Sequence, residues 1–137
     1  MNKKIAAAFA ASLLAAGIAA AEEPGAPRAL TAADLQKLYG ERAVVMTTTG
    51  PRHLRYEVAP DGRMIGHNLD LIGGAAVASG TSDGKWRVDA AANKVCHDWT
   101  NGRWQSACFV VVQTGPDSYE WSLGGAPGGM KFTVAPK

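Results

Sequence analysis

Two of the three histidines, His67 and His97, lie in stretches where apolar residues alternate with polar ones, as in half-buried strands. Imidazole can act as a general base, a proton shuttle or a metal ligand. Neighbouring strand residues point to opposite faces, so His97 and the adjacent Asp98 are not expected to form a catalytic dyad. We expect His67 and His97 to face an apolar interior, where packing is a commoner role than catalysis, and His53 to lie on a polar face.

Local patterns for metal or nucleotide chemistry are absent from the sequence. No two histidines have the His-x-x-x-His spacing, and no acid occupies a zincin position. Met46, Met64 and Met130 with a histidine would suit copper, but core filling is the expected role of methionine. There is no nucleophile elbow, P-loop, dinucleotide fingerprint or EF-hand loop. We therefore expect no cofactor, no bound metal and no enzyme activity.

The four tryptophans are the main candidates for binding. Some must belong to the core, but strands rich in aromatic residues also line barrel mouths and protein-binding faces. The candidate ligand-binding residues are therefore the tryptophans together with two histidines: Trp86, Trp99, Trp104, Trp121, His67 and His97.

The only two cysteines, Cys96 and Cys108, flank an Asn101-Gly102 turn. A three-residue loop of residues 101–103 places the two cysteines opposite each other, whereas a two-residue turn would place Cys96 opposite Ala107. Disulfide geometry favours the first register. We expect a structural disulfide, because no Cys-x-x-Cys motif supports a redox role.

The first 21 residues have the pattern of a secretory signal peptide. Lys3 and Lys4 precede an apolar run from Ile5 to Ala20, and small residues end at Ala21. We expect cleavage there and a periplasmic or secreted protein, which permits the disulfide. Residues 22–29 are expected to form a disordered linker, and residues 30–137 a single β-rich domain.

The charge balance offers no sign of a nucleic-acid or membrane partner. The chain has 14 basic and 12 acidic residues, and removal of the signal segment takes away two lysines and no acid. The mature chain is then formally neutral, so we expect neither nucleic-acid binding nor membrane insertion.

A short helix is predicted just after the linker. Thr31 is placed to cap it, Asp34 completes a capping box, and Leu30 and Leu35 have the spacing of a hydrophobic staple. Gly40 is placed to end the helix. A helix of this length must dock on something larger to be stable.

Alternating strands and turn residues fill the rest of the chain. The expected inward faces include the sets that begin at Leu54, Trp86, Tyr119 (through Leu123) and Met130. The expected turns are at residues 60–62, 83–84, 101–102, 115–118 and 124–129. This spacing predicts a mainly β fold, an antiparallel meander of seven to nine strands that is barrel-like or strongly curved.

One hairpin leaves two registers open. The Pro60-Asp61-Gly62 turn favours a loop that sets Val58 against Met64. Matching of apolar faces instead favours Tyr56 opposite Ile65, and a bulge would reconcile the two. The facing of His67 depends on which register forms.

The order of several short motifs resembles an uncharacterised family of small exported proteobacterial proteins. The resemblance spans most of the mature chain, and its segments are residues 30–35, residues 56–62, Gly84-x-Trp86-x-Val88, Cys96-x-x-Trp99 and Cys108-Phe109-x-Val111. Residues 73–80 and 89–94 fit the pattern less well. The resemblance implies a small β-rich periplasmic domain with one disulfide and no established activity, and it transfers no catalytic residue.

Two functions follow as hypotheses. The first is a non-enzymatic periplasmic module that binds a small apolar or aromatic ligand, or an envelope partner, on an aromatic-lined surface. The alternative is an inhibitor of an envelope or secreted hydrolase, with the loop from Gly124 to Gly129 as its insertion element.

Overall fold

The computed structural model describes residues 26–50, 53–72, 75–100, 104–124 and 129–137, with the backbone alone for residues 70–72 and 75–79. These residues form one helix and nine strands: β1 (Arg28–Ala29), α1 (Ala32–Gly40), β2 (Val44–Thr48), β3 (Leu54–Val58), β4 (Arg63–Ile72), β5 (Ala75–Asp89), β6 (Lys94–Trp99), β7 (Ala107–Gly115), β8 (Ser118–Ser122) and β9 (Met130–Pro136).

Strands β2 to β9 pair antiparallel in sequence order, and pairing of β2 with β9 closes them into an eight-stranded barrel. Closure removes the free edges that would invite aggregation. Strand β1 lies outside the closed ring and pairs with β7 through Arg28 opposite Gln113. The predicted antiparallel β meander is therefore confirmed as a barrel, but Arg28 and Ala29 are ordered into a strand where we expected linker.

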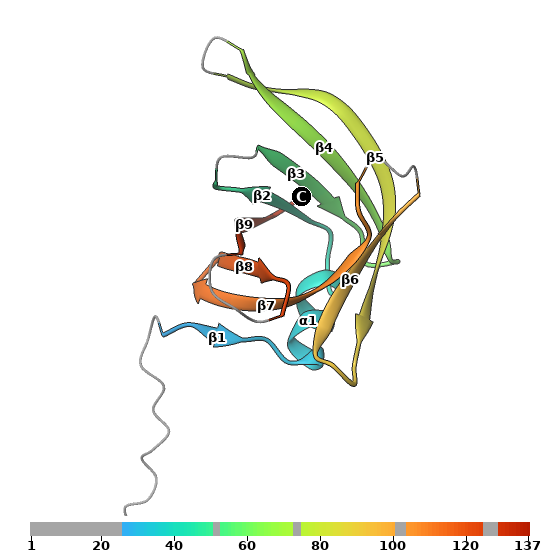
Figure 1. Cartoon of the computed structure of the whole chain (residues 1–137), viewed down its shortest axis with the longest axis vertical. Coiled ribbons are helices and arrows are strands. Elements are labelled where there is room, and N and C mark those ends of the chain that lie inside the picture. Colours follow the sequence, from blue (N-terminus) through green and yellow to red (C-terminus); the bar gives the residue numbers. More distant parts are fainter. Residues whose placement is uncertain (1–25, 51–52, 73–74, 101–103, 125–128) are drawn as a thin grey trace, which may run out of the picture.

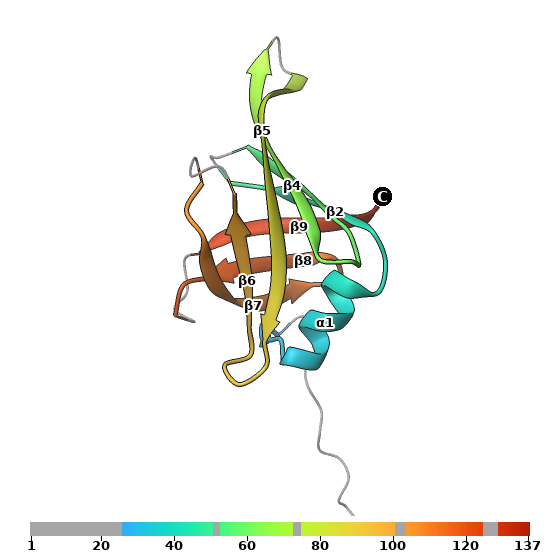
Figure 2. The same cartoon turned by 90° about the vertical axis from the view of Figure 1, so that its right-hand side faces the viewer.

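The two ends of the barrel differ (Figure 1). Helix α1 lies at the end where β5 turns into β6, and it contacts both strands. The connections β2–β3, β6–β7 and β8–β9 lie at the opposite end, because successive strands run in alternating directions. The long β4–β5 hairpin projects beyond the other strands at that opposite end (Figure 2). We call this end of the barrel, opposite α1, the mouth.

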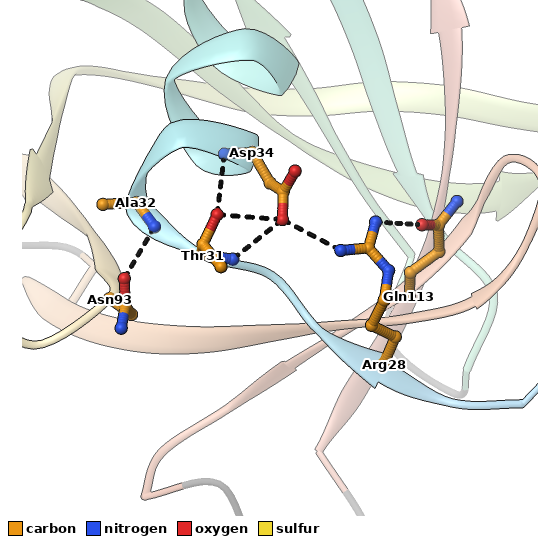
Figure 3. A network of polar contacts seen from close by, with 6 residues as sticks. All are labelled: Arg28, Thr31, Ala32, Asp34, Asn93 and Gln113. Carbon is orange, nitrogen blue, oxygen red and sulfur yellow. Dashed lines mark hydrogen bonds and ion pairs between the residues drawn. The ribbon is translucent and has the colours of Figure 1, made fainter. Parts of the chain in front are cut away.

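Helix α1 begins as the sequence predicts (Figure 3). The Thr31 hydroxyl accepts a hydrogen bond from the Asp34 backbone N–H at 3.2 Å, and the Asp34 carboxylate accepts one from the Thr31 N–H at 3.0 Å. The capping box is confirmed. The helix ends directly after Gly40, but Glu41 caps it in an ordinary right-handed conformation, so no left-handed glycine is needed.

Side chains from the barrel complete the attachment of the helix (Figure 3). The Asn93 side-chain oxygen, in the β5–β6 turn, accepts a hydrogen bond from the Ala32 N–H at 2.7 Å. Arg28 donates one to Asp34 at 2.9 Å and one to Gln113 at 3.2 Å. The first turn of α1 is thereby tied to β1, to β7 and to the β5–β6 turn. The described part of the chain contains no helix long and apolar enough to span a membrane.

The turn chemistry decides the open register of the β3–β4 hairpin. Val58 lies opposite Met64 and Tyr56 opposite Gly66, with Pro60-Asp61-Gly62 as a three-residue loop. Gly62 has a φ of 99°, a left-handed conformation that favours glycine. Ile65 lies opposite Glu57 rather than Tyr56. It therefore points outward, and it is 38% exposed.

Two other sequence expectations are wrong. Asp83 and Gly84 do not form a turn but lie within β5, where the buried Gly84 leaves space for the Trp99 indole. Leu123 does not extend the buried face of β8, since the strand ends at Ser122 and Leu123 is 71% exposed.

The cysteine register is confirmed. Cys96 in β6 lies opposite Cys108 in β7, and the two form a disulfide. The described residues contain no free cysteine. The Asn101-Gly102-Arg103 loop itself lies outside the described residues.

Candidate functional site

A cavity of about 620 Å³ opens at the mouth of the barrel. Its described lining comes from β3 and the residue before it, from β4, from the β6–β7 hairpin and from the facing ends of β8 and β9. We call it the mouth cavity. Its aromatic wall consists of Tyr56, Trp99, Trp104, Phe109 and His97, and its aliphatic lining includes Leu54, Leu69, Leu123 and Met130.

The aromatic rings of the wall contact one another. Trp99 and Trp104 meet edge to face with ring centroids 4.7 Å apart, and Tyr56 lies 5.7 Å from Trp99 and 5.5 Å from Trp104. The Phe109 ring lies next to His97, with the ring centroids 5.2 Å apart. Such contacts hold large side chains in fixed positions. The rings of the wall thus form one continuous set of aromatic contacts beside the cavity.

Glycines on the nearby strands β4 and β5 make room for these indoles. A side chain on Gly66 in β4 would collide with Trp104 and Trp99, and one on Gly84 in β5 would collide with Trp99. Both glycines are buried. Inside the barrel, the Trp99 and Trp104 indoles thus pack directly against the backbone at Gly66, and Trp99 also against the backbone at Gly84.

Below the cavity the barrel is filled by side chains. Trp121 stacks on Phe132 with a centroid distance of 3.6 Å, and Tyr56 meets Trp121 edge to face at 5.2 Å. Trp86 lies near the closed end, 5.4 Å from the Tyr39 ring, and donates a hydrogen bond to the Ala59 carbonyl. The interior therefore has a closed, packed half and an open half.

A polar chain crosses the boundary between these halves. Tyr39, which α1 inserts into the barrel, has no exposed surface. Its hydroxyl lies 3.0 Å from the Trp121 indole nitrogen and 2.9 Å from His97 Nε2. His97 is 3% exposed and borders the mouth cavity. The docked helix thus supplies the group that orients the histidine beneath the cavity.

Burial determines the ionisation of both groups. Desolvation lowers the pKa of His97 to about 3, because the imidazolium would lose its hydration among aromatic rings. Desolvation raises the pKa of Tyr39 far above its usual value, against a smaller lowering by the Trp121 hydrogen bond. Both groups are neutral at physiological pH.

The candidate residues divide between cavity, core and exterior. Trp99, Trp104 and His97 line the mouth cavity. Trp86 and Trp121 are 7% and 4% exposed and belong to the packed half of the barrel. Alternation places Trp86, Trp99 and Trp121 inside the barrel but does not give their height along its axis.

His67 does not face the interior, contrary to expectation. It lies opposite Arg55 and Thr81 on the outer face, where its Nε2 is 2.6 Å from a Glu57 oxygen. Hydrogen bonds from Lys137 first and His67 second hold the pKa of Glu57 below its usual range. The loop register explains the error, because Gly66 and Asn68 face inward and His67 between them must face out.

No acid–base dyad forms at His97. Asp98 points to the outer face, where it accepts a hydrogen bond from Arg87 at 3.2 Å. Met46 and Met64 are core residues, and Met130 lies apart from them at the mouth. In the described part of the chain, no group of three or more His, Cys, Asp or Glu residues is arranged to hold a metal ion.

Sequence reasoning missed two of the five residues of the aromatic wall and all of the polar rim. Tyr56 and Phe109 were assigned only to buried faces or to a motif, and His53, Asn68 and Gln105 lie at the rim. His53, which we expected on a polar face, directly precedes β3 at this rim. The register with Val58 opposite Met64 would have been enough to find Tyr56. It places Tyr56 opposite Gly66, against which the tryptophan indoles pack.

The inserted loop of the inhibitor hypothesis is only partly described. Gly124 has a φ of 118°, and Gly129 donates a hydrogen bond to Glu120, but residues 125–128 lie outside the described residues.

Comparison with known proteins adds no relative, since no family model, curated protein or solved structure matches the chain.

Proposed function

We propose that the protein is a non-enzymatic binding protein that holds a small, apolar, aromatic ligand in the mouth cavity. The supporting observation is the cavity of about 620 Å³ with an aromatic wall. Binding sites for small molecules are typically concave, mostly apolar and several hundred Å³ in volume, with a few polar groups. Barrels of eight strands are large enough to hold one such ligand.

The division of the barrel supports the same proposal. Stacked Trp121 and Phe132 fill the lower half, and α1 closes that end. A ligand that enters from the mouth therefore meets a rigid floor rather than a channel through the molecule. Preformed apolar sites bind with little ordering cost, since their side chains are already fixed.

We infer that this binding takes place outside the cytoplasm. The signal-peptide pattern of residues 1–21 and the Cys96–Cys108 disulfide support an exported protein. A periplasmic or secreted carrier of an apolar compound would need to shield that compound from water, which a one-ended barrel does.

Titration with pyrene tests the proposal. Pyrene is uncharged and planar, and its emission spectrum reports the polarity around it. We expect one pyrene per chain, with micromolar affinity and an apolar emission signature. Trp104→Ala should weaken binding at least about tenfold, because the half-buried indole forms one side of the cavity.

Ile65→Ala is the matched control, since Ile65 lies on the outer face of β4 and is 38% exposed. Its affinity for pyrene should equal that of the unaltered protein. Absence of binding, or equal weakening by both substitutions, would contradict the proposal. If pyrene binds as expected, native mass spectrometry of protein purified from its own source would identify the natural ligand.

A further inference from the structure

The polar chain under the mouth cavity has a fixed direction. An indole N–H can only donate, so Trp121 Nε1 donates to the Tyr39 hydroxyl oxygen. The Tyr39 hydroxyl then has its own proton to donate, and His97 Nε2 lies 2.9 Å from it. If Nε2 also carried a proton, the buried tyrosine proton would have no acceptor, at the cost of an unpaired buried polar group. Nε2 is therefore the acceptor.

The direction of this chain sets the tautomer of His97. A neutral imidazole with an accepting Nε2 carries its proton on Nδ1. No hydrogen bond joins Nδ1 to another described residue; the one hydrogen bond of the ring is that of Nε2. The ring borders the mouth cavity. Nδ1–H therefore has no partner among the described residues and belongs to a ring at the border of the cavity.

We propose that the ligand of the mouth cavity is an uncharged, planar aromatic ketone or quinone whose oxygen accepts a hydrogen bond from His97 Nδ1–H at the inner end of the cavity. This inference rests on the proposed function and adds the chemical class of the ligand. Tyr39 and Trp121 act as positioning residues, because they hold the proton on the side of the ring that a ligand can reach.

The lining favours an uncharged ligand. Its described residues include no Lys, Arg, Asp or Glu. The ring neighbours of His97 are Tyr39, Tyr56, Trp99, Phe109 and Trp121, none of which carries charge at neutral pH. A carboxylate buried here would lose its hydration without an opposite charge to replace it. A carbonyl oxygen loses less hydration and gains one directed hydrogen bond.

Three tricyclic probes of nearly equal shape test the inference on the purified, disulfide-bonded protein. 9-Fluorenone carries an acceptor, fluorene carries neither donor nor acceptor, and carbazole carries an N–H donor at the same place. Equilibrium dialysis gives the three dissociation constants. We expect fluorenone to bind about fivefold more tightly than fluorene, which corresponds to one net hydrogen bond, and carbazole to bind no more tightly than fluorene.

Tyr39→Phe tests the role of the chain. Without the tyrosine proton, Nε2 is free to carry the imidazole proton and Nδ1 to become an acceptor. The advantage of fluorenone over carbazole should then shrink or reverse. Tyr119→Phe is the matched control, because Tyr119 lies on β8 outside the mouth cavity and stacks on Phe132; it should leave the ranking unchanged.

Nitrogen NMR of the unaltered protein provides a readout that does not depend on the variants folding. His97 should show a protonated Nδ1 and an unprotonated Nε2. The opposite tautomer, or fluorenone binding no better than fluorene, would overturn the hydrogen-bond inference while leaving an aromatic binding site in place. Failure of both fluorenone and fluorene to bind would overturn the proposed function and this inference together.

Discussion

At the residue scale, His97 connects the stability of the protein to pH. Burial lowers its pKa in the folded protein to about 3, whereas the unfolded chain has the ordinary value of 6.5. Between these values the unfolded chain binds a proton that the folded protein does not. The free energy of unfolding must therefore fall as the pH is lowered from 6.5.

We predict a loss of up to about 1.4 kcal/mol in the free energy of unfolding per pH unit in this window. His97→Gln should remove this dependence while lowering the melting temperature, because the glutamine does not ionise and packs less well. Urea unfolding at pH 7.5, 6 and 5 measures it. Asp34, Glu57 and Asp61 have lowered pKa values, so their stabilisation is lost only as the pH falls below their ordinary values of 3.8 for the aspartates and 4.5 for Glu57. Equal slopes in both proteins would contradict the assignment.

A second residue-scale prediction concerns the glycine under the indoles. Gly66→Ala should lower the free energy of unfolding by about 1–3 kcal/mol, because the new methyl group would displace Trp104 and Trp99. It should also weaken pyrene binding in the folded protein. Gly50→Ala is the matched control, since a methyl group there meets nothing within 4 Å. Urea unfolding compares the two, and similar losses at both glycines would contradict the packing described here.

At the scale of the elements, the sequence carried local information well. The Thr31–Asp34 capping box, the Pro60-Asp61-Gly62 loop and the opposed cysteines each depend on residues close together in the chain. Expectations failed where distant residues decide. Asp83-Gly84 has the composition of a turn, but Trp99 packs against that glycine and β5 continues through it.

The cap of α1 has a measurable energy. Thr31→Ala should lower the free energy of unfolding by about 1 kcal/mol, because the Asp34 N–H loses its acceptor. Thr49→Ala is the control, since the Thr49 side chain is exposed and outside the helix. Thermal unfolding of both variants gives the difference. An unchanged melting temperature for Thr31→Ala would mean that the cap contributes nothing.

The disulfide joins β6 to β7 at the level of His97. On the chain-entropy account, closing a loop of about 13 residues stabilises a protein by about 3 kcal/mol. The double substitution Cys96→Ala with Cys108→Ala should cost about that amount in urea unfolding. Thiol labelling of the unreduced, unfolded protein should find no free thiol. Labelling at two sites per chain would show that the bond does not form in solution.

At the scale of the whole molecule, the binding site depends on height within the barrel. Alternation along each strand shows which side chains face inward, but only the registers of all eight strands show how far along the axis they lie. Trp86 and Trp121 therefore entered the candidate set although they are core, and Tyr56 was left out. No local pattern in the sequence contains that information.

The export expectation is tested on the whole chain, because residues 1–21 lie outside the described residues. We predict that the full-length chain is cut after Ala21 and recovered from the periplasm as a soluble protein that begins at Glu22. Leucine in place of both Ala19 and Ala21 should block cleavage, since small residues are needed at these two positions. A chain that starts at Glu22 should stay in the cytoplasm with reduced cysteines and lower stability, because that compartment keeps thiols reduced. N-terminal mass determination after fractionation decides the matter, and recovery of the full-length precursor in the membrane fraction would show that the segment is a retained anchor.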